Sequence, residues 1–133
     1  MNTFTMQTWD EQVVSGAEGG PRVAHAHATF EYAGLIEGTS VSDSLLYYAG
    51  AGYDSGGVTS SGLEHFEASV GGRKGTFVVR HEYTYSADSH HVSSRFSVVP
   101  GSATAELTGL TGSGTISGSS QTMDYTFEPV FGE

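Results

Sequence analysis

Apolar and polar residues alternate along most of this chain with a period of two. Successive side chains of a β-strand point to opposite faces, so the pattern predicts strands with one buried face. Short stretches rich in Gly and Ser separate these segments, as is typical of an all-β sandwich or barrel. The predicted strands are residues 3–9, 22–32, 37–48, 58–69, 76–86, 91–99, 104–110 and 123–128, with 114–118 left open as an extra or edge strand.

The segments between the predicted strands are short and have turn-forming composition. Residues 18–21 read Glu-Gly-Gly-Pro, and residues 71–74 read Gly-Gly-Arg-Lys. Such connections make antiparallel hairpins, because a parallel crossover needs a dozen or more residues. One short helix is predicted over residues 10–17. About eight antiparallel strands in 133 residues predict one all-β domain, residues 1–133, closed into a small barrel whose lumen holds side chains or one small ligand.

Composition and charge exclude several classes of function. Five Lys and Arg residues stand against fifteen Asp and Glu residues, and the formal net charge of −10 would repel nucleic acid and anionic membranes. The chain has no cysteine, which excludes disulfides, thiol nucleophiles and thiolate metal sites. Residues 1–12 lack a basic segment followed by an apolar run, and no stretch of about eighteen apolar residues occurs. We therefore expect a cytoplasmic protein with no nucleic-acid or membrane partner.

Two ionisable residues fall on strand faces that are otherwise apolar. Glu64 shares its face with Phe66 in one predicted strand, and His81 shares its face with Val79 and Tyr83 in the next. Apolar neighbours of this kind are buried in a barrel of this size. Both ionisable side chains are therefore expected to point into the barrel.

The connection at residues 71–74 places these two residues relative to each other, since turn length sets strand register. A two-residue loop at Gly72-Arg73, or a four-residue loop over 71–74, makes Glu64 and His81 direct partners. A two-residue loop at Gly71-Gly72 makes them diagonal neighbours instead. In either register they lie on one face, with about 5–8 Å between their backbone positions.

An enclosed carboxylate beside an imidazole predicts an acid–base pair, with Glu64 and His81 as catalytic residues. The alternative interpretation is a buried polar pair that satisfies its own hydrogen bonds and stabilises the fold. Inward aromatic residues favour a ligand cavity, because a buried Tyr hydroxyl needs a partner, whereas a core built for stability uses Phe, Val and Leu. The predicted ligand-binding residues are Tyr32, Phe66, Tyr83, Tyr85, Phe96 and Tyr125.

A separate pattern in residues 19–38 raises the question of a metal site. His25, His27 and Glu31 stand between flanking glycines at the spacing of the first cupin pattern, and imidazole and carboxylate groups on one strand face suit a divalent metal. The second cupin pattern, which supplies a third His, is missing, and the two His lie on the more polar face of their strand. We therefore expect no metal and no cofactor, with a cupin-like metal-dependent enzyme using His25, His27 and Glu31 as the alternative.

Further motifs extend nearly from end to end of the chain. They are Trp9-Asp10-Glu11, Glu18-Gly19-Gly20-Pro21, Ile36-Glu37-Gly38, Gly62-Leu63-Glu64-His65-Phe66, Gly71-Gly72-Arg73-Lys74-Gly75-Thr76-Phe77-Val78, Val99-Pro100-Gly101-Ser102, Gly109-Leu110-Thr111-Gly112 and Tyr125-Thr126-Phe127. In these motifs the chain resembles the bacterial domain-of-unknown-function family 3224, whose members look like the allene oxide cyclase type of β-barrel. The resemblance implies an eight-stranded barrel related in shape to allene oxide cyclase and dirigent proteins, which guide cyclisation of hydrophobic substrates without a cofactor. It implies no particular reaction.

The leading hypothesis is a barrel that binds a small, largely apolar molecule, such as a secondary metabolite, and promotes its isomerisation or cyclisation without a cofactor. Confinement of one substrate conformer and proton transfer by Glu64 and His81 would accelerate the reaction. The alternative is a non-catalytic ligand-binding or carrier barrel that uses the same cavity. The expected partner is a small-molecule ligand or substrate, and association into a homo-oligomer stays open.

Overall fold

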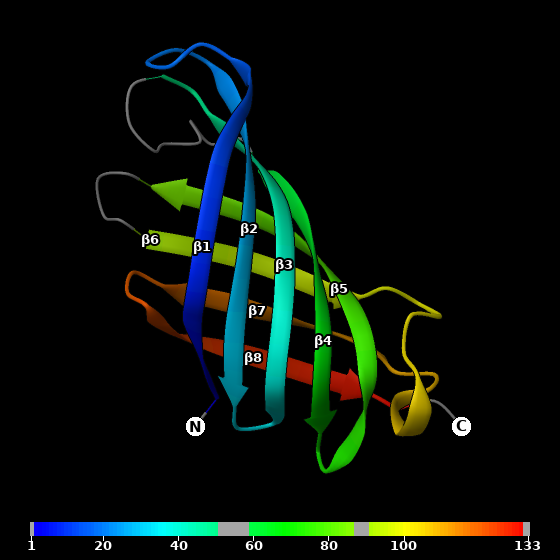
Figure 1. Ribbon diagram of the computed structural model, residues 1–133. Coiled ribbons are helices and arrows are strands. Elements are labelled where there is room, and N and C mark those ends of the chain that lie inside the picture. The colour runs from blue at the N-terminus through cyan, green and yellow to red at the C-terminus, as the bar shows by residue number, and fades with distance from the viewer. Residues whose placement is uncertain (1, 51–58, 87–90, 132–133) are drawn as a thin grey trace.

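The computed structural model describes residues 2–50, 59–86 and 91–131, without the side chains of residues 85 and 86. In that part of the chain, eight antiparallel strands follow one another around a closed barrel, and the last strand pairs with the first (Figure 1). The elements are β1 (Thr3–Gly16), β2 (Arg22–Ala33), β3 (Ile36–Tyr48), β4 (Ser60–Val70), β5 (Arg73–Ser86), β6 (His91–Val98), the 3-10 helix η1 (Ala105–Leu107), β7 (Thr111–Gly118) and β8 (Thr122–Val130). The predicted small antiparallel barrel of about eight strands is confirmed.

The first strand is longer than the sequence pattern predicts. Residues 10–17 are expected to form a short helix, but β1 continues through them to Gly16. Pairing with β2 extends along the whole of β1 and is interrupted by two β-bulges. The helix prediction is wrong because this long-range pairing satisfies the backbone groups of residues 10–16, and a local pattern does not show it.

Residues 104–110 are the second difference from the prediction. They form η1 and a loop rather than a strand, and the segment 114–118, which the sequence pattern leaves open as an extra strand, lies in β7. Leu107 and Leu110 are each only 1 % exposed, because they pack into the core beside β5. The strand prediction fails here because a segment that covers the end of a barrel buries apolar residues just as a wall strand does. Among the described residues, no helix has the length and apolar character that a membrane crossing needs.

The barrel closes through a short seam between β1 and β8. The pairing described there spans three residue pairs, from Thr3↔Asp124 to Thr5↔Thr122. Beyond the seam, β1 pairs only with β2 in the described residues, and this hairpin rises away from β7 and β8 (Figure 1). Among the described residues, strand pairing therefore does not continue along this side of the barrel.

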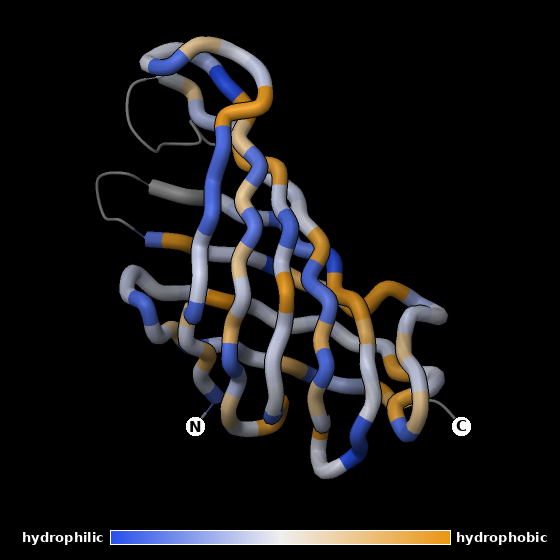
Figure 2. Tube along the Cα trace, viewed as in Figure 1, coloured by the Kyte–Doolittle hydropathy of each residue, from blue (hydrophilic) through white to orange (hydrophobic). Residues whose placement is uncertain are grey.

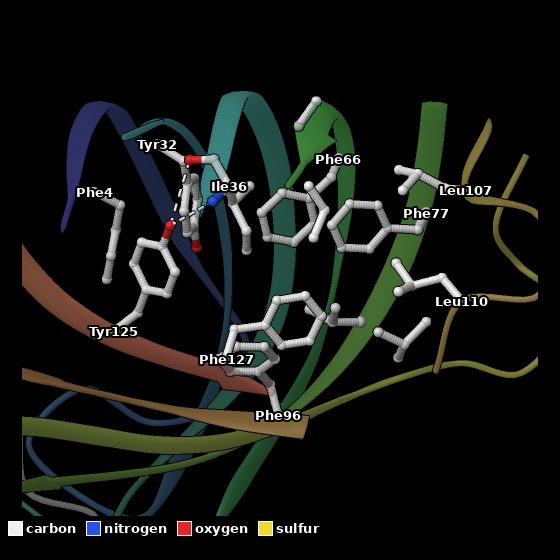
Figure 3. Packing of buried hydrophobic residues seen from close by; sticks show 14 of the residues in the cluster. Phe4, Tyr32, Ile36, Phe66, Phe77, Phe96, Leu107, Leu110, Tyr125 and Phe127 are labelled. Carbon is white, nitrogen blue, oxygen red and sulfur yellow. Dashed lines mark hydrogen bonds between the residues drawn. The ribbon is translucent and has the colours of Figure 1, made fainter. Parts of the chain in front are cut away.

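One half of the lumen is filled by large apolar side chains. Phe66 and Phe77 stack with ring centroids 4.6 Å apart and an interplanar angle of 3°, and Tyr32 packs edge-on against Phe66 at 4.8 Å. Figure 3 shows these rings together with Leu107 and Leu110, which lie at the end of the cluster. The core residues are Phe4, Tyr32, Ile36, Phe66, Ala68, Val70, Phe77, Val79, Phe96, Val98, Leu107, Leu110, Ile116, Tyr125 and Phe127. Tight packing of this kind leaves no room for a ligand in this half.

The other half of the lumen is hollow because small residues face inward there. Blue and orange alternate along β2, β3 and β4 in Figure 2, as expected for walls with one face inside and one outside. The inward positions of these strands at the hollow end are occupied by Ala26, Ala28, Ser42, Ser44 and Ser60, all buried. They leave a cavity of about 950 Å³, at the upper end of the range of small-molecule sites.

Candidate functional site

The turn between β4 and β5 decides how Glu64 and His81 meet. It is a two-residue turn at Gly71 and Gly72, whose φ angles are +57° and +86°, and Val70 pairs with Arg73 across it. Positive φ at both central residues is the requirement of a type I′ hairpin turn, and glycine meets it without strain. Of the two registers left open by the sequence, the diagonal one is therefore the one observed.

In this register the acid and the imidazole are in direct contact. Gly62 pairs with His81 and Glu64 pairs with Val79, so the two side chains are diagonal neighbours on the inner face. His81 Nε2 lies 2.6 Å from Glu64 Oε1, and both residues are 1 % exposed. The predicted proximity of Glu64 and His81 in the barrel interior is what the geometry shows.

The pair belongs to a hydrogen-bond network that extends to three other strands, β2, β3 and β6. Glu64 Oε2 accepts hydrogen bonds from the hydroxyls of Tyr32 at 2.8 Å and Ser40 at 2.5 Å. On the other side, His81 Nδ1 lies 2.9 Å from the hydroxyl of Ser94, which is also buried. Among the described residues, no buried polar side-chain atom lacks a partner. The network therefore holds the carboxylate at one position and in one orientation.

The network meets the cavity through only some of its members. Glu64, Tyr32 and Tyr83 border the cavity, whereas His81 does not. The His81 ring is covered by the ring of Tyr83, stacked at a centroid distance of 4.9 Å, and by Phe96 at 5.5 Å. A ligand in the cavity therefore meets Glu64 first, and the imidazole lies behind it.

Burial raises the pKa of the two cavity phenols. Desolvation raises the pKa of Tyr32 well above 10.0, and the nearby Glu64 carboxylate raises it further. The same two causes, again with desolvation first, raise the pKa of Tyr83, while hydrogen bonds from Ser44 and Ser42 partly oppose them. At neutral pH both hydroxyls are hydrogen-bond donors next to a carboxylate.

The other predicted ligand-binding residues lie elsewhere. Phe66, Phe96 and Tyr125 belong to the packed core and do not border the cavity. The hydroxyl of Tyr125 accepts a hydrogen bond from the backbone N–H of Ile36 at 2.8 Å (Figure 3), so it anchors the turn between β2 and β3. The side chain of Tyr85 lies outside the described residues.

The mouth of the cavity carries a cluster that the sequence reasoning missed. Glu11 accepts hydrogen bonds from Trp9 Nε1 at 3.2 Å and from the hydroxyl of Tyr48 at 2.9 Å. Arg22 lies over the Tyr48 ring at 4.8 Å and donates to the backbone carbonyl of Gly50 at 2.6 Å. Glu11 falls in the segment predicted as a helix and Trp9 is the last residue of the strand predicted before it, so the period-two pattern was not extended to the part of β1 that reaches the mouth.

The inward serines of β3 were missed as well. Ser40, Ser42 and Ser44 face inward, while Val41 and Leu45 on the same strand face outward and are exposed. The apolar residues are therefore on the outer face, the reverse of the usual arrangement. The available signal was the alternation of serine at every second position, read together with the inward register of the neighbouring strands.

Of the three residues of the alternative metal site, His25 and His27 lie together and Glu31 does not join them. His25 and His27 point to the outer surface, where both bind the carboxylate of Asp43 on β3, at 3.0 and 2.7 Å. The hydrogen bond from His27 is the largest cause that lowers the pKa of Asp43. Glu31 lies further along β2, opposite Thr39. In the described residues, no group of three or more His, Asp or Glu side chains is arranged to hold a metal ion.

Comparisons with known proteins identify the fold and leave the activity open. The family model described as "Protein of unknown function (DUF3224)" matches residues 1–128. A similar crystal structure is that of a protein of unknown function from the DUF3224 family of Shewanella oneidensis MR-1. Its sequence is 21% identical, the match covers 100% of this chain and 98% of that one, and the TM-score is 0.71. No curated protein matches the chain.

Proposed function

The chain belongs to the DUF3224 family, and from its cavity we propose that it binds a small, largely apolar molecule and isomerises or cyclises it without a cofactor. Glu64 is the group that exchanges a proton with the substrate. His81 is a positioning residue that holds the carboxylate and shares its proton. The observation that supports this proposal is a carboxylate–imidazole pair, 1 % exposed, at the inner boundary of a cavity of about 950 Å³.

The cavity walls favour an apolar ligand. Phe4, Phe30, Met6, Ile116 and Met123 border the cavity, and burial of apolar surface is worth about 25 cal/mol per Å². The polar residues that border it include Ser42, Ser44 and Tyr83 near Glu64 and, elsewhere along the cavity, Glu11, Glu18 and Arg22. Such a site binds through its apolar surface and orients through a small number of polar contacts.

Proton transfer is the chemistry that the network supports. Removal of a proton from the substrate would place it on Glu64, and the contact between Oε1 and His81 Nε2 at 2.6 Å lets the pair share it. Three hydrogen-bond partners fix the carboxylate before the substrate arrives, so little reorganisation accompanies the reaction. A folded substrate conformer held in the cavity would lose part of its entropic barrier.

A generic substrate tests the proposal without knowledge of the natural one. 5-Nitrobenzisoxazole is planar and apolar, and removal of the C–H proton of its isoxazole ring breaks the N–O bond and yields a coloured cyanophenolate. We expect wild-type protein to accelerate this reaction. Glu64→Gln should lower the rate by at least about 10²-fold, the usual size of a general-base contribution. His81→Gln should shift the pH profile of the rate as well as lower it.

Controls on the outer face of β4 separate chemistry from stability. Glu67 and His65 are exposed on this strand, so Glu67→Gln and His65→Gln should leave the rate unchanged. Binding is followed separately through the fluorescence of Trp9, the single tryptophan, which borders the cavity. 1-Nitronaphthalene bound in the cavity should quench this fluorescence. Saturable quenching with no elimination above the Glu64→Gln level would assign the protein as a carrier barrel. Absence of quenching would refute the cavity as a binding site.

A further inference from the structure

Three hydroxyl groups in the cavity wall keep hydrogen-bonding capacity for a ligand. Ser42, Ser44 and Tyr83 all border the cavity, and we refer to them as the hydroxyl stripe. The Ser42 and Ser44 oxygens are 3.5 Å apart, and the Ser44 and Tyr83 oxygens are 3.4 Å apart. Good O–H···O bonds measure about 2.5–3.0 Å, so these contacts are weak. The hydrogen-bonding capacity of the three hydroxyls is therefore poorly satisfied by the contacts among them.

The sequence places the stripe next to Glu64. Ser42 is the direct partner of Glu64 across β3 and β4, and Ser44 is the partner of Gly62. A side chain at position 62 would collide with the Ser44 hydroxyl, so glycine there leaves the space in which Ser44 and Tyr83 approach each other. A ligand oxygen at the stripe thus lies close to the carboxylate.

Tyr83 is the strongest donor of the stripe. It is half-buried and accepts a hydrogen bond from Ser44, and its own O–H proton is directed to no acceptor among the described residues. Desolvation first, and then Glu64, raise its pKa, so the phenol stays protonated at neutral pH and above. A neutral phenol beside a carboxylate is suited to stabilise a negative charge that develops on an oxygen during the reaction.

We infer that the substrate is an enolisable ketone whose carbonyl oxygen binds Tyr83 and Ser44, an assignment that rests on the proposed proton transfer by Glu64. The carboxylate takes a proton from the carbon next to the carbonyl group, and that C–H bond breaks. Its electron pair forms a C=C bond, and the carbonyl π electrons move to the oxygen, which accepts the Tyr83 hydrogen bond. In a ketone with a C=C bond between its β- and γ-carbons, return of the proton from Glu64 to the γ-carbon moves that double bond next to the carbonyl group and re-forms the C=O bond, so the isomer forms without a co-reactant.

The charges around the cavity favour a neutral substrate of this kind. Glu11, Glu18 and Glu64 all border it. Arg22, the cation at the mouth, is engaged by the backbone carbonyls of Gly20 and Gly50. A carboxylate or phosphate ligand would meet net repulsion, whereas a neutral ketone needs only donors.

Two matched probes test the assignment of Tyr83. 2-Naphthol has the shape of the enol of 2-tetralone, and 2-methylnaphthalene replaces its hydroxyl by a methyl group of similar size. By calorimetry we expect wild-type protein to prefer 2-naphthol by about tenfold, the size of one good hydrogen bond. Tyr83→Phe should abolish this preference, and Ser44→Ala should reduce it. Tyr47→Phe, at another cavity tyrosine, should change the affinity for both probes equally.

The chemical step is followed as deuterium uptake into 2-tetralone in D₂O by NMR. Tyr83→Phe should slow the exchange about 10²-fold, the usual loss when one donor to an oxyanion is removed. Glu64→Gln should stop the exchange but keep the preference for 2-naphthol.

The outcomes separate the two proposals. If Tyr83→Phe keeps both the preference and the wild-type exchange rate, the carbonyl assignment is overturned. Wild-type protein that reacts with 5-nitrobenzisoxazole but exchanges no deuterium into 2-tetralone overturns it too, and leaves the proposed function standing. Exchange that is as fast in Glu64→Gln as in wild type overturns the proposed function itself.

Discussion

Filling the cavity with a leucine at position 28 should stabilise the protein and prevent ligand binding. Ala28 is 1 % exposed, faces inward from the middle of β2 and borders the cavity. Its direct partner on β3 is Ser42, so an added side chain would extend across the space where the ligand is expected to lie. Stability and function should therefore change in opposite directions.

The magnitude follows from the atoms added. Leucine adds three carbons to alanine, and each buried CH₂ equivalent contributes about 0.8 kcal/mol, or about 2.4 kcal/mol in total. Loss of rotamer freedom opposes this by about 0.5–1 kcal/mol. The free energy of unfolding should rise by about 1.5 kcal/mol, which for a domain of this size corresponds to about 6 °C in Tm.

A second alanine of the same strand is the control. Ala24 is 0 % exposed, but it does not border the cavity. A leucine there must displace packed neighbours, so Ala24→Leu should lower the free energy of unfolding by about 1–3 kcal/mol.

The assays are thermal unfolding and quenching of Trp9 by 1-nitronaphthalene. Ala28→Leu should raise Tm and weaken quenching at least tenfold. If it instead destabilises the protein as much as Ala24→Leu does, the hollow half of the barrel is not empty, and the argument for a ligand site there fails.

Three further predictions concern the core. Glu64→Leu leaves His81 buried without its partner and should cost about 3–5 kcal/mol in urea unfolding, whereas replacing both residues by apolar ones should recover most of the loss. The folded-state pKa of Tyr32 is raised above its unfolded value of 10.0. Its contribution to stability is therefore complete below pH 10 and is lost as the pH rises further. Tyr32→Phe should flatten the alkaline decline in the free energy of unfolding, measured by denaturant unfolding at several pH values. Gly114→Ala would place a methyl group against the Thr126 carbonyl and the Phe96 ring, and a loss of about 3 kcal/mol is expected; an unchanged denaturation midpoint would contradict it.

Local chemistry was enough to predict the architecture. Period-two alternation identified the wall strands, and short turns excluded parallel crossovers, so an antiparallel barrel followed. The predictions failed at residues 10–17 and 104–110, where a long hairpin and an end cap decide the structure. Both depend on contacts with segments distant in the chain, which a local pattern does not contain.

The candidate site, too, could be predicted from the sequence only in part. Glu64 and His81 could be predicted as neighbours because one short turn links their strands, and local geometry limits that turn to a few registers. The actual register needed the positive φ angles of Gly71 and Gly72, which appear only in the folded chain.

What the amino-acid order determined alone is which residues share a strand face, because alternation is a property of the extended backbone itself. Which faces enclose a space is a different matter, since it depends on how side chains from non-adjacent strands add up across the lumen. Phe66 and Phe96 fill one half, and the small residues Ala28 and Ser42 leave the other half hollow. Only the closed barrel brings these residues together, and it thereby decides that Glu64 borders a cavity while His81 lies behind it.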